Sequence, residues 1–173
     1  MSDELLPPSI ADVSRRKEHV HRVRGVNGGG ARTEVSVRSF AFAMDEPEQR
    51  HGTDSAQTPL ETVVAALVGC KGATIHSVAQ AMRFAYAGVR FEASSVIDLR
   101  GPRGVKGVRP YFESVDLAIE VFTDETDRRV QQLIRNVEAR CPVANLLRAA
   151  EVVTAIDWRV RPAAEATVEA TAE

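Results

Sequence analysis

Residues 58–84 read TPLETVVAALVGCKGATIHSVAQAMRF, and this stretch predicts one long, largely buried helix around which the chain is organised. Its start is well marked. Thr58 is a suitable N-cap, Pro59 fits the first helical position, and Glu61 stands three residues after the threonine. This spacing is that of a capping box, in which the two side chains bond to each other's backbone N–H groups.

The first half of the predicted helix is apolar on every side. From Val63 to Gly69 nearly every residue is apolar, which is typical of a helix buried all round. The run is too short to span a bilayer, and Lys71 ends it. One small sheet cannot cover so much apolar surface. We therefore predict that a second subunit packs against this helix.

Small and polar residues surround the cysteine in the middle of the helix. Gly69 and Gly72 flank Cys70, and Thr74 lies one turn further on, on the same face. Each glycine costs a helix about 1 kcal/mol relative to alanine. Their presence indicates that another backbone comes close, or that space is left over the thiol.

Composition limits the class of protein. The chain has 173 residues, of which 44% are hydrophobic, and this favours one domain with a substantial core. The net charge is −2, from 22 basic and 24 acidic residues mixed along the chain, which gives no argument for nucleic acid or an anionic membrane as partner. We recognise no signal peptide and no segment of transmembrane length, and so expect a cytoplasmic protein.

The rest of the chain alternates between strand and helix patterns. Residues 124–140 show an apolar stripe at i, i+3, i+4 and i+7, typical of an amphipathic helix. We predict a folded domain over 18–160, between flexible segments at 1–17 and 161–173. The order of elements predicts an α+β fold with mostly antiparallel sheets around the long central helix. The predicted elements are strands at 18–26, 33–44, 89–99, 111–122 and 151–160, and helices at 58–84, 124–140 and 143–149.

The chain has two cysteines, Cys70 and Cys141. Pro142 fits a first helical position, which makes Cys141 the N-cap of a short helix, where unpaired N–H groups favour a thiolate. The pair is then either a redox site, in which one thiol attacks a peroxide and the other forms a disulfide with it, or two inert buried cysteines. The four histidines and the cysteines show no metal-ligand spacing, so we predict no metal site.

Two motifs resemble the OsmC/Ohr family, the osmotically inducible and organic hydroperoxide resistance proteins. QTPLETVVAALVGC, residues 57–70, is similar to the family's central-helix signature, and VEARCPVANLL, residues 137–147, is similar to its second-cysteine motif. The preceding loop, MDEPEQRHGTDSAQTP, is similar to a variant in the OsmC-like branch. The resemblance covers about residues 32–160.

The resemblance implies a fold, an assembly and a reaction. The fold is an intertwined homodimer in which two central helices pack between antiparallel sheets, with active sites at the subunit interface. The reaction is thiol-dependent reduction of organic hydroperoxides to alcohols, which requires a thiol reductant of unknown identity and no cofactor. Cys70 would be the peroxide-attacking thiolate and Cys141 the resolving cysteine.

The resemblance also implies an arginine beside the attacking thiolate. Arg38 and Arg32 both lie in the matching region, and spacing does not decide between them. We place Arg38 first, because it is predicted to lie within a strand, whereas Arg32 is close to the glycine turn at 28–30. Apolar and small residues beside the thiol would bind the alkyl part of a substrate: Val63, Ala66, Leu67 and Thr74.

One position departs from the hydroperoxide reductases, which typically have Glu directly after the helix-start proline. This chain has Leu60 there, and Glu61 one position later. Glu61 is nine residues before Cys70, about 180° away around the helix, so capping explains it better than catalysis. The alternative function is therefore a dimeric OsmC-like protein that binds a small apolar ligand in the interface groove without peroxidase activity.

Overall fold

The computed structural model describes residues 18–166, which form two compact units, 18–65 and 66–166. Helix α1 (Pro59–Met82) begins in the first unit and ends in the second. The segment predicted to be flexible at 1–17 lies outside the described residues, as does 167–173. Regular structure continues past Val160, the last residue of the predicted domain, into a 3-10 helix at Ala163–Glu165.

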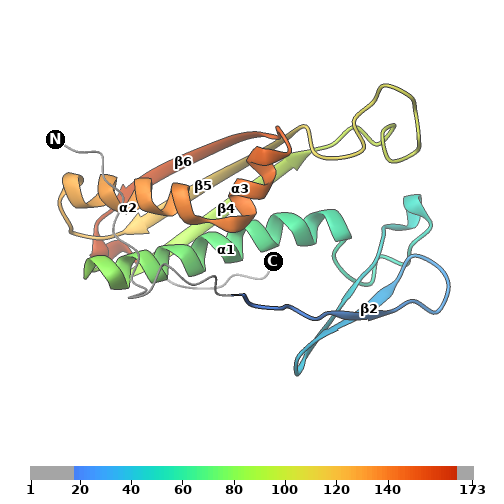
Figure 1. Cartoon of the computed structure of the whole chain (residues 1–173), viewed down its shortest axis with the longest axis horizontal. Coiled ribbons are helices and arrows are strands. Elements are labelled where there is room, and N and C mark those ends of the chain that lie inside the picture. Colours follow the sequence, from blue (N-terminus) through green and yellow to red (C-terminus); the bar gives the residue numbers. More distant parts are fainter. Residues whose placement is uncertain (1–17, 167–173) are drawn as a thin grey trace. The chain divides into compact units, whose positions relative to one another are not determined.

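The unit 18–65 contains an antiparallel sheet in the order β1-β2-β3. Asn27 shapes the turn that leads into β2, because its side-chain amide donates to the carbonyls of Gly30 and Arg32 at 3.1 and 2.9 Å. The strands are drawn in blue and cyan in Figure 1. The elements are β1 (Arg24–Val26), β2 (Thr33–Val37), β3 (Phe40–Met44) and the 3-10 helix η1 (Glu48–Arg50).

The prediction of one strand over 33–44 is wrong. The chain turns at Arg38 and Ser39, and β2 pairs with β3 as a hairpin, with Val37 opposite Phe40. Arg38 has a φ of 57°, in the left-handed region, as a tight hairpin turn requires. The interruption of the alternating pattern near Ser39 is this turn. Arg38 therefore does not lie within a strand. A strand position can no longer be the reason for preferring Arg38 to Arg32 as the arginine beside the thiolate.

A buried carboxylate organises the loop before α1. Asp45 is fully buried, and its Oδ2 accepts four hydrogen bonds, from the backbone N–H and the hydroxyl of both Thr53 and Ser55, at 2.6–3.2 Å. The hydroxyl of Thr53, more than any other group, holds the pKa of Asp45 well below its usual range. The loop also needs Gly52, since a Cβ there would lie 1.6 Å from the carbonyl oxygen of Glu46.

The start of α1 is confirmed. Thr58 N–H donates to Glu61 Oε2 at 2.7 Å, and Glu61 N–H donates to Thr58 Oγ1 at 3.2 Å. These two hydrogen bonds lower the pKa of Glu61, and the positive charge of Arg50 lowers it further by a smaller amount. Glu61 thus has the capping role that its position around the helix predicted.

The unit 66–166 contains a mixed sheet in the order β4-β5-β6. β4 and β5 pair antiparallel, whereas β5 and β6 pair parallel, and the connection between them contains both remaining α-helices. A parallel pair needs such a crossover. The elements are β4 (Gly88–Val96), β5 (Ser114–Phe122), α2 (Asp127–Arg140), α3 (Pro142–Ala149), β6 (Val153–Arg161) and η2 (Ala163–Glu165).

Helices α1 and α2 lie on one face of this sheet (Figure 1). The sheet supplies alternate residues of β5 to the core, and the other face carries charged pairs such as those of Glu120 with Arg90 and Arg161. The buried apolar side chains include Leu67, Ile75, Val78, Val115, Leu117, Ile119, Val121, Val130, Leu133 and Val137. The predicted α+β fold with mostly antiparallel pairing around a long helix is confirmed.

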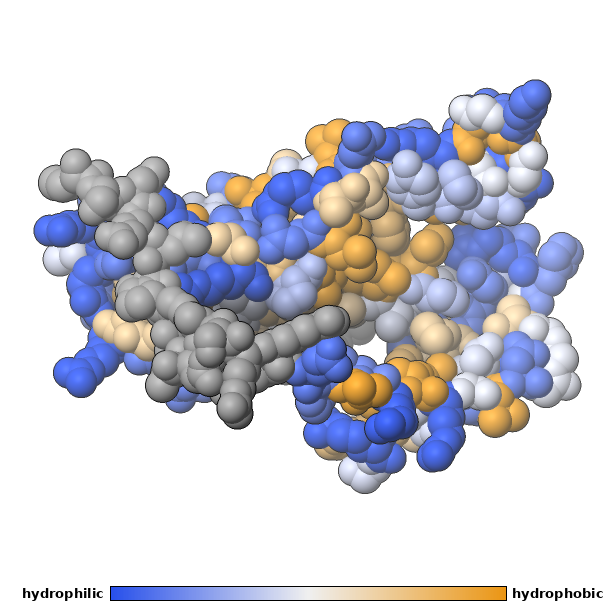
Figure 2. All heavy atoms as spheres, viewed as in Figure 1, coloured by the Kyte–Doolittle hydropathy of each residue, from blue (hydrophilic) through white to orange (hydrophobic). Residues whose placement is uncertain are grey.

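The apolar run at 63–69 is not buried on all sides in the single chain. Leu67 is buried, but Val63, Ala66 and Gly69 are exposed. Figure 2 shows hydrophobic side chains at the surface beside α1 and α3, where Leu146 is 68% exposed. The prediction that no segment reaches transmembrane length is also wrong. Helix α1 continues past Lys71 to a total length of 24 residues, and by length and composition alone it is long and apolar enough to cross a membrane. One row of its side chains, which includes Leu67, Ile75 and Val78, nevertheless packs in the core. Core helices of soluble proteins can have the same length and composition.

We predict that Asp45→Ala lowers the free energy of unfolding by about 2–4 kcal/mol, because four donors lose a charged acceptor. Since the pKa of Asp45 is depressed, this stability is present above the unfolded pKa of Asp and is lost as pH falls through the folded value. Urea unfolding at pH 7 and at lower pH measures both effects. The control is Glu48→Ala, an exposed residue of η1, for which we expect a change within about 0.5 kcal/mol. Equal effects of the two changes would contradict the organising role of Asp45.

Candidate functional site

The two cysteines meet, although 71 positions separate them. Cys70 is half-buried in the middle of α1, and Cys141 is fully buried at the start of α3. Their sulfur atoms are 3.4 Å apart, and both thiols are free. A disulfide bond is about 2.05 Å long, so the two sulfurs would have to approach each other by little more than about 1 Å to be joined.

The turn between α2 and α3 places Cys141 against α1. Helix α2 buries Val130, Leu133 and Val137 and ends at Arg140. Cys141 then leaves the helical region with φ −68° and ψ 112°, and Pro142 starts α3. The predicted N-cap position of Cys141 is confirmed.

The prediction that the start of α3 favours a Cys141 thiolate is wrong for the reduced protein. Burial raises the pKa of the Cys141 thiol, and the nearby Cys70 raises it further, while the backbone N–H of Ala144 and the charge of Lys71 lower it. Desolvation of a charged sulfur outweighs the helix N-terminus here. The more exposed Cys70 is thus the better placed of the two for contact with a reagent.

An ion pair between the fully buried Lys71 and the partly exposed Glu138 lies beside the two thiols. The Lys71 side chain is 0% exposed, and its Nζ donates to Glu138 Oε1 at 2.6 Å. The same oxygen accepts a hydrogen bond from Trp158 Nε1 at 3.0 Å, and Arg148 lies 3.7 Å from the other oxygen of Glu138. We call Lys71, Glu138, Arg148 and Trp158 the Glu138 cluster.

Sequence reasoning missed the Glu138 cluster. Lys71 was read only as the end of an apolar run, yet it is four residues from both Leu67 and Ile75. This spacing places it on the buried face of the helix, which was the available signal. Nothing in the local sequence pattern identifies Glu138 as its partner.

The predicted substrate-binding residues differ in their accessibility. Val63 and Ala66 are exposed, whereas Leu67 is 2% exposed and packs in the core, where a substrate does not reach it. The hydroxyl of Thr74 donates to the carbonyl of Cys70 at 2.7 Å, so it faces the helix backbone rather than the thiol. The accessible surface on the helix face before Cys70 comes from Val63 and Ala66.

The two candidate arginines have different surroundings in the unit 18–65. Arg32 donates to Glu34 Oε1 at 2.7 and 2.9 Å and also to the hydroxyl of Ser55. Arg38 is exposed in the hairpin turn, with its guanidinium 5.0 Å from the centre of the Phe40 ring. Within the described residues, Arg38 pairs with no carboxylate.

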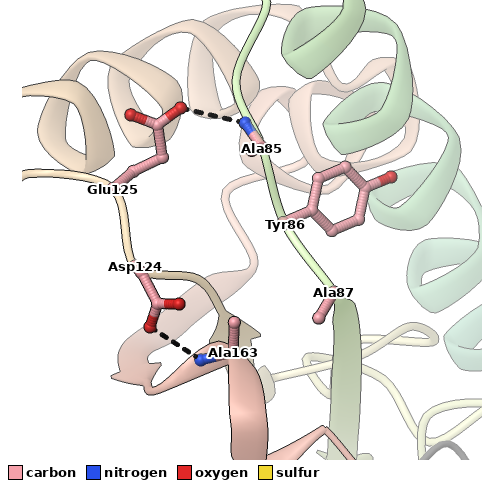
Figure 3. Close-up of a pocket in the computed structure, with 6 residues that line it drawn as sticks. All are labelled: Ala85, Tyr86, Ala87, Asp124, Glu125 and Ala163. Atoms are coloured by element: carbon pink, nitrogen blue, oxygen red, sulfur yellow. Dashed lines mark hydrogen bonds between the residues drawn. The ribbon is translucent and has the colours of Figure 1, made fainter.

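A hollow lies away from the thiols in the unit 66–166, where the links before β4 and before α2 meet η2. It has a volume of about 380 Å³ and is lined by Ala85, Tyr86, Ala87, Asp124, Glu125 and Ala163. Its two carboxylates already accept bonds from the backbone, Glu125 from Ala85 N–H at 2.9 Å and Asp124 from Ala163 N–H at 3.0 Å (Figure 3). Neither cysteine lines it, so it is not part of the thiol site.

Within residues 18–166, no group of three or more His, Cys, Asp or Glu side chains could hold a metal ion. The described site itself brings together two adjacent thiols and the Lys71–Glu138 ion pair.

Comparison with known proteins agrees with this architecture. A family model described as OsmC-like protein matches residues 52–156. An OsmC like protein from Mycoplasma pneumoniae has a TM-score of 0.69 at 17% identity, covering 84% of this chain and 99% of its own. An organic hydroperoxide resistance protein from Elizabethkingia anophelis has a TM-score of 0.63 at 15% identity, covering 86% and 99%.

A third similar structure is an organic hydroperoxide resistance protein OsmC from Legionella pneumophila, with a TM-score of 0.61 at 15% identity, covering 84% and 99%. At these identities the structures establish the fold. No curated protein matches the chain.

We predict that the azo oxidant diamide converts Cys70 and Cys141 into an intramolecular disulfide, because their sulfurs are already in contact. Intact mass should fall by two hydrogens, without a disulfide-linked dimer on a non-reducing gel. Iodoacetamide at pH 7 should modify Cys70 before Cys141, since Cys141 is buried and its pKa is raised. The Cys70→Ser variant is the control and should not lose mass. A disulfide between two chains, or faster labelling of Cys141, would contradict this geometry.

Proposed function

The chain belongs to the OsmC-like protein family, and from this premise we propose that it is a thiol-dependent peroxidase that reduces organic hydroperoxides to alcohols. The observation that carries the proposal is the 3.4 Å separation of the Cys70 and Cys141 sulfurs. Two inert buried cysteines would need neither this contact nor the partial exposure of Cys70. The names of the similar structures, which include organic hydroperoxide resistance proteins, support the same substrate class.

The proposed reaction has three steps. The Cys70 thiolate attacks one peroxide oxygen, so that an S–O bond forms, the O–O bond breaks, and the other oxygen leaves as an alcohol after taking a proton. Cys141 then attacks the sulfur of the Cys70 sulfenic acid, releasing water and forming a disulfide. An external dithiol, whose identity the chain does not specify, returns two electrons and two protons.

Activation of Cys70 must come from outside its own helix, because the middle of a helix gains little from the dipole. We propose Arg38 before Arg32 for this role. The reason now differs from that based on sequence: Arg32 is already engaged by Glu34 and Ser55, whereas the guanidinium of Arg38 pairs with no carboxylate in the described residues. An unpaired guanidinium can donate to a thiolate and to a peroxide oxygen together.

A homodimer is part of the proposal. Val63, Ala66 and Gly69 leave an apolar strip of α1 exposed in the single chain, and, apart from its own stretch of helix, no described atom lies within 4 Å of a Cβ built at Gly69. A second copy would bury this strip and supply the apolar surroundings that favour an alkyl hydroperoxide over hydrogen peroxide. A cycle of thiols also requires a reducing compartment, consistent with the expected cytoplasmic location.

We predict that cumene hydroperoxide, more than hydrogen peroxide, oxidises the protein to the intramolecular disulfide. Cys70→Ser should abolish turnover. Cys141→Ser should consume one equivalent of peroxide and stop at a sulfenic acid on Cys70, which dimedone traps and mass spectrometry locates. Reaction of Cys70→Ser but not of Cys141→Ser would reverse the assigned roles.

The same assay tests the arginine assignment. Arg38→Ala should slow the first oxidation and raise the pKa of Cys70, and Arg32→Ala should do less. If diamide forms the disulfide but no organic peroxide does, the peroxidase is refuted and the apolar ligand-binding alternative is favoured.

We predict that Gly69→Leu weakens the dimer at least about tenfold in Kd, which corresponds to about 1.4 kcal/mol, because the added side chain meets a partner rather than open space. Sedimentation equilibrium measures the constant, with circular dichroism as a check on folding. Gln131→Leu, at an exposed position of α2 rather than α1, is the control and should leave the dimer unchanged. A folded wild-type monomer at micromolar concentration would refute the dimer.

A further inference from the structure

We propose that Lys71 is a positioning residue for the resolving cysteine: its ammonium, held in place by Glu138, is the counter-ion of the Cys141 thiolate during disulfide formation. This inference rests on the proposed function and assigns a role in its second step to a residue outside the cysteine pair and the arginines.

The burial of Lys71 requires an explanation beyond helix packing. Its side chain is 0% exposed on the core face of α1. A buried ammonium is costly unless it is paired, and an apolar residue of similar size in place of a buried ion pair is often neutral or stabilising. Lys71 follows Cys70 directly in the chain, and Glu138 lies three residues before Cys141. The ion pair thus links the two segments that carry the thiols.

Lys71 is the fully buried cation of the Glu138 cluster. Its carboxylate partner Glu138 also accepts from Trp158 and lies 3.7 Å from Arg148, so Lys71 shares this carboxylate with other donors. Arg148 is 50% exposed and solvent screens its charge, whereas the charge of Lys71 is not screened in this way. A Cys141 thiolate would give the buried ammonium a second anionic partner.

The titratable groups that face Cys141 are Cys70 and Lys71, and they act in opposite directions. Burial and Cys70 raise the pKa of the Cys141 thiol, whereas the positive charge of Lys71 lowers it. In the resolving step, the Cys141 sulfur loses its proton and attacks the sulfur of Cys70 sulfenic acid. The S–S bond forms as the S–O bond breaks, and the leaving oxygen takes the proton and departs as water. Lys71 stabilises the thiolate on which this step depends.

The test separates an electrostatic role from a merely structural one. In a Cys70→Ser background, the pKa of Cys141 is measured from thiolate absorbance at 240 nm against pH. We expect Lys71→Met to raise it by about one unit, a tenfold loss of thiolate near neutral pH. Glu138→Gln should lower it, because Lys71 then has the Cys141 thiolate as its main counter-ion. Lys71→Arg should restore most of the wild-type value, and Lys106→Met, in an exposed loop, should leave it unchanged.

With both cysteines present, stopped-flow oxidation by cumene hydroperoxide should show resolution slowed about tenfold in Lys71→Met, with the first oxidation changed less than about threefold. The proposal is overturned if Lys71→Met leaves the pKa of Cys141 unchanged, or if Glu138→Gln raises it, as general loosening of the site would do. Should Lys71→Met fail to fold, Glu138→Gln and Lys71→Arg decide the sign by themselves. The pKa measurement uses no peroxide, so it stands even if the proposed peroxidase activity is refuted.

Discussion

The ion pair between the fully buried Lys71 and the partly exposed Glu138 is the polar contact that ties together the two helices around the thiol site. It joins the middle of α1 to the last turn of α2, and each partner lies next to a cysteine-bearing segment. The sulfur–sulfur contact of 3.4 Å is therefore held by neighbours on both sides. Removal of Glu138 would leave the fully buried ammonium of Lys71 without its carboxylate partner, which is costly.

Local sequence patterns predicted the elements well where a single local cause operates. The capping box at Thr58 and Glu61, the amphipathic stripe of α2 and the proline that makes Cys141 an N-cap all depend on residues within a few positions of one another. The hairpin turn at Arg38 was missed because a non-glycine residue there adopts the left-handed conformation. The break in the alternation of apolar and polar residues near Ser39 marked the position of the turn, but it did not show that the chain reverses direction there.

The site was predicted only in part, for a related reason. Both cysteines could be identified, but the environment of Cys141 is set by burial, which competes with the helix N-terminus and outweighs it. The partner of Lys71 is 67 positions away, so its identity depends on how α1 and α2 pack rather than on any local pattern. The hydrogen bonds of Asp45 with Thr53 and Ser55 are likewise a property of the closed loop.

The parallel pairing of β5 with β6 has a consequence for the order in which the molecule is made. Among the described residues β6 is the last strand, and Trp158 on it donates to Glu138, so the Glu138 cluster is complete only after this strand has left the ribosome and paired. Synthesis proceeds at about 5–20 residues per second, and non-local strand pairing is slow compared with helix formation. Both cysteines therefore emerge before β6, and Trp158 reaches Glu138 only once this strand has paired with β5.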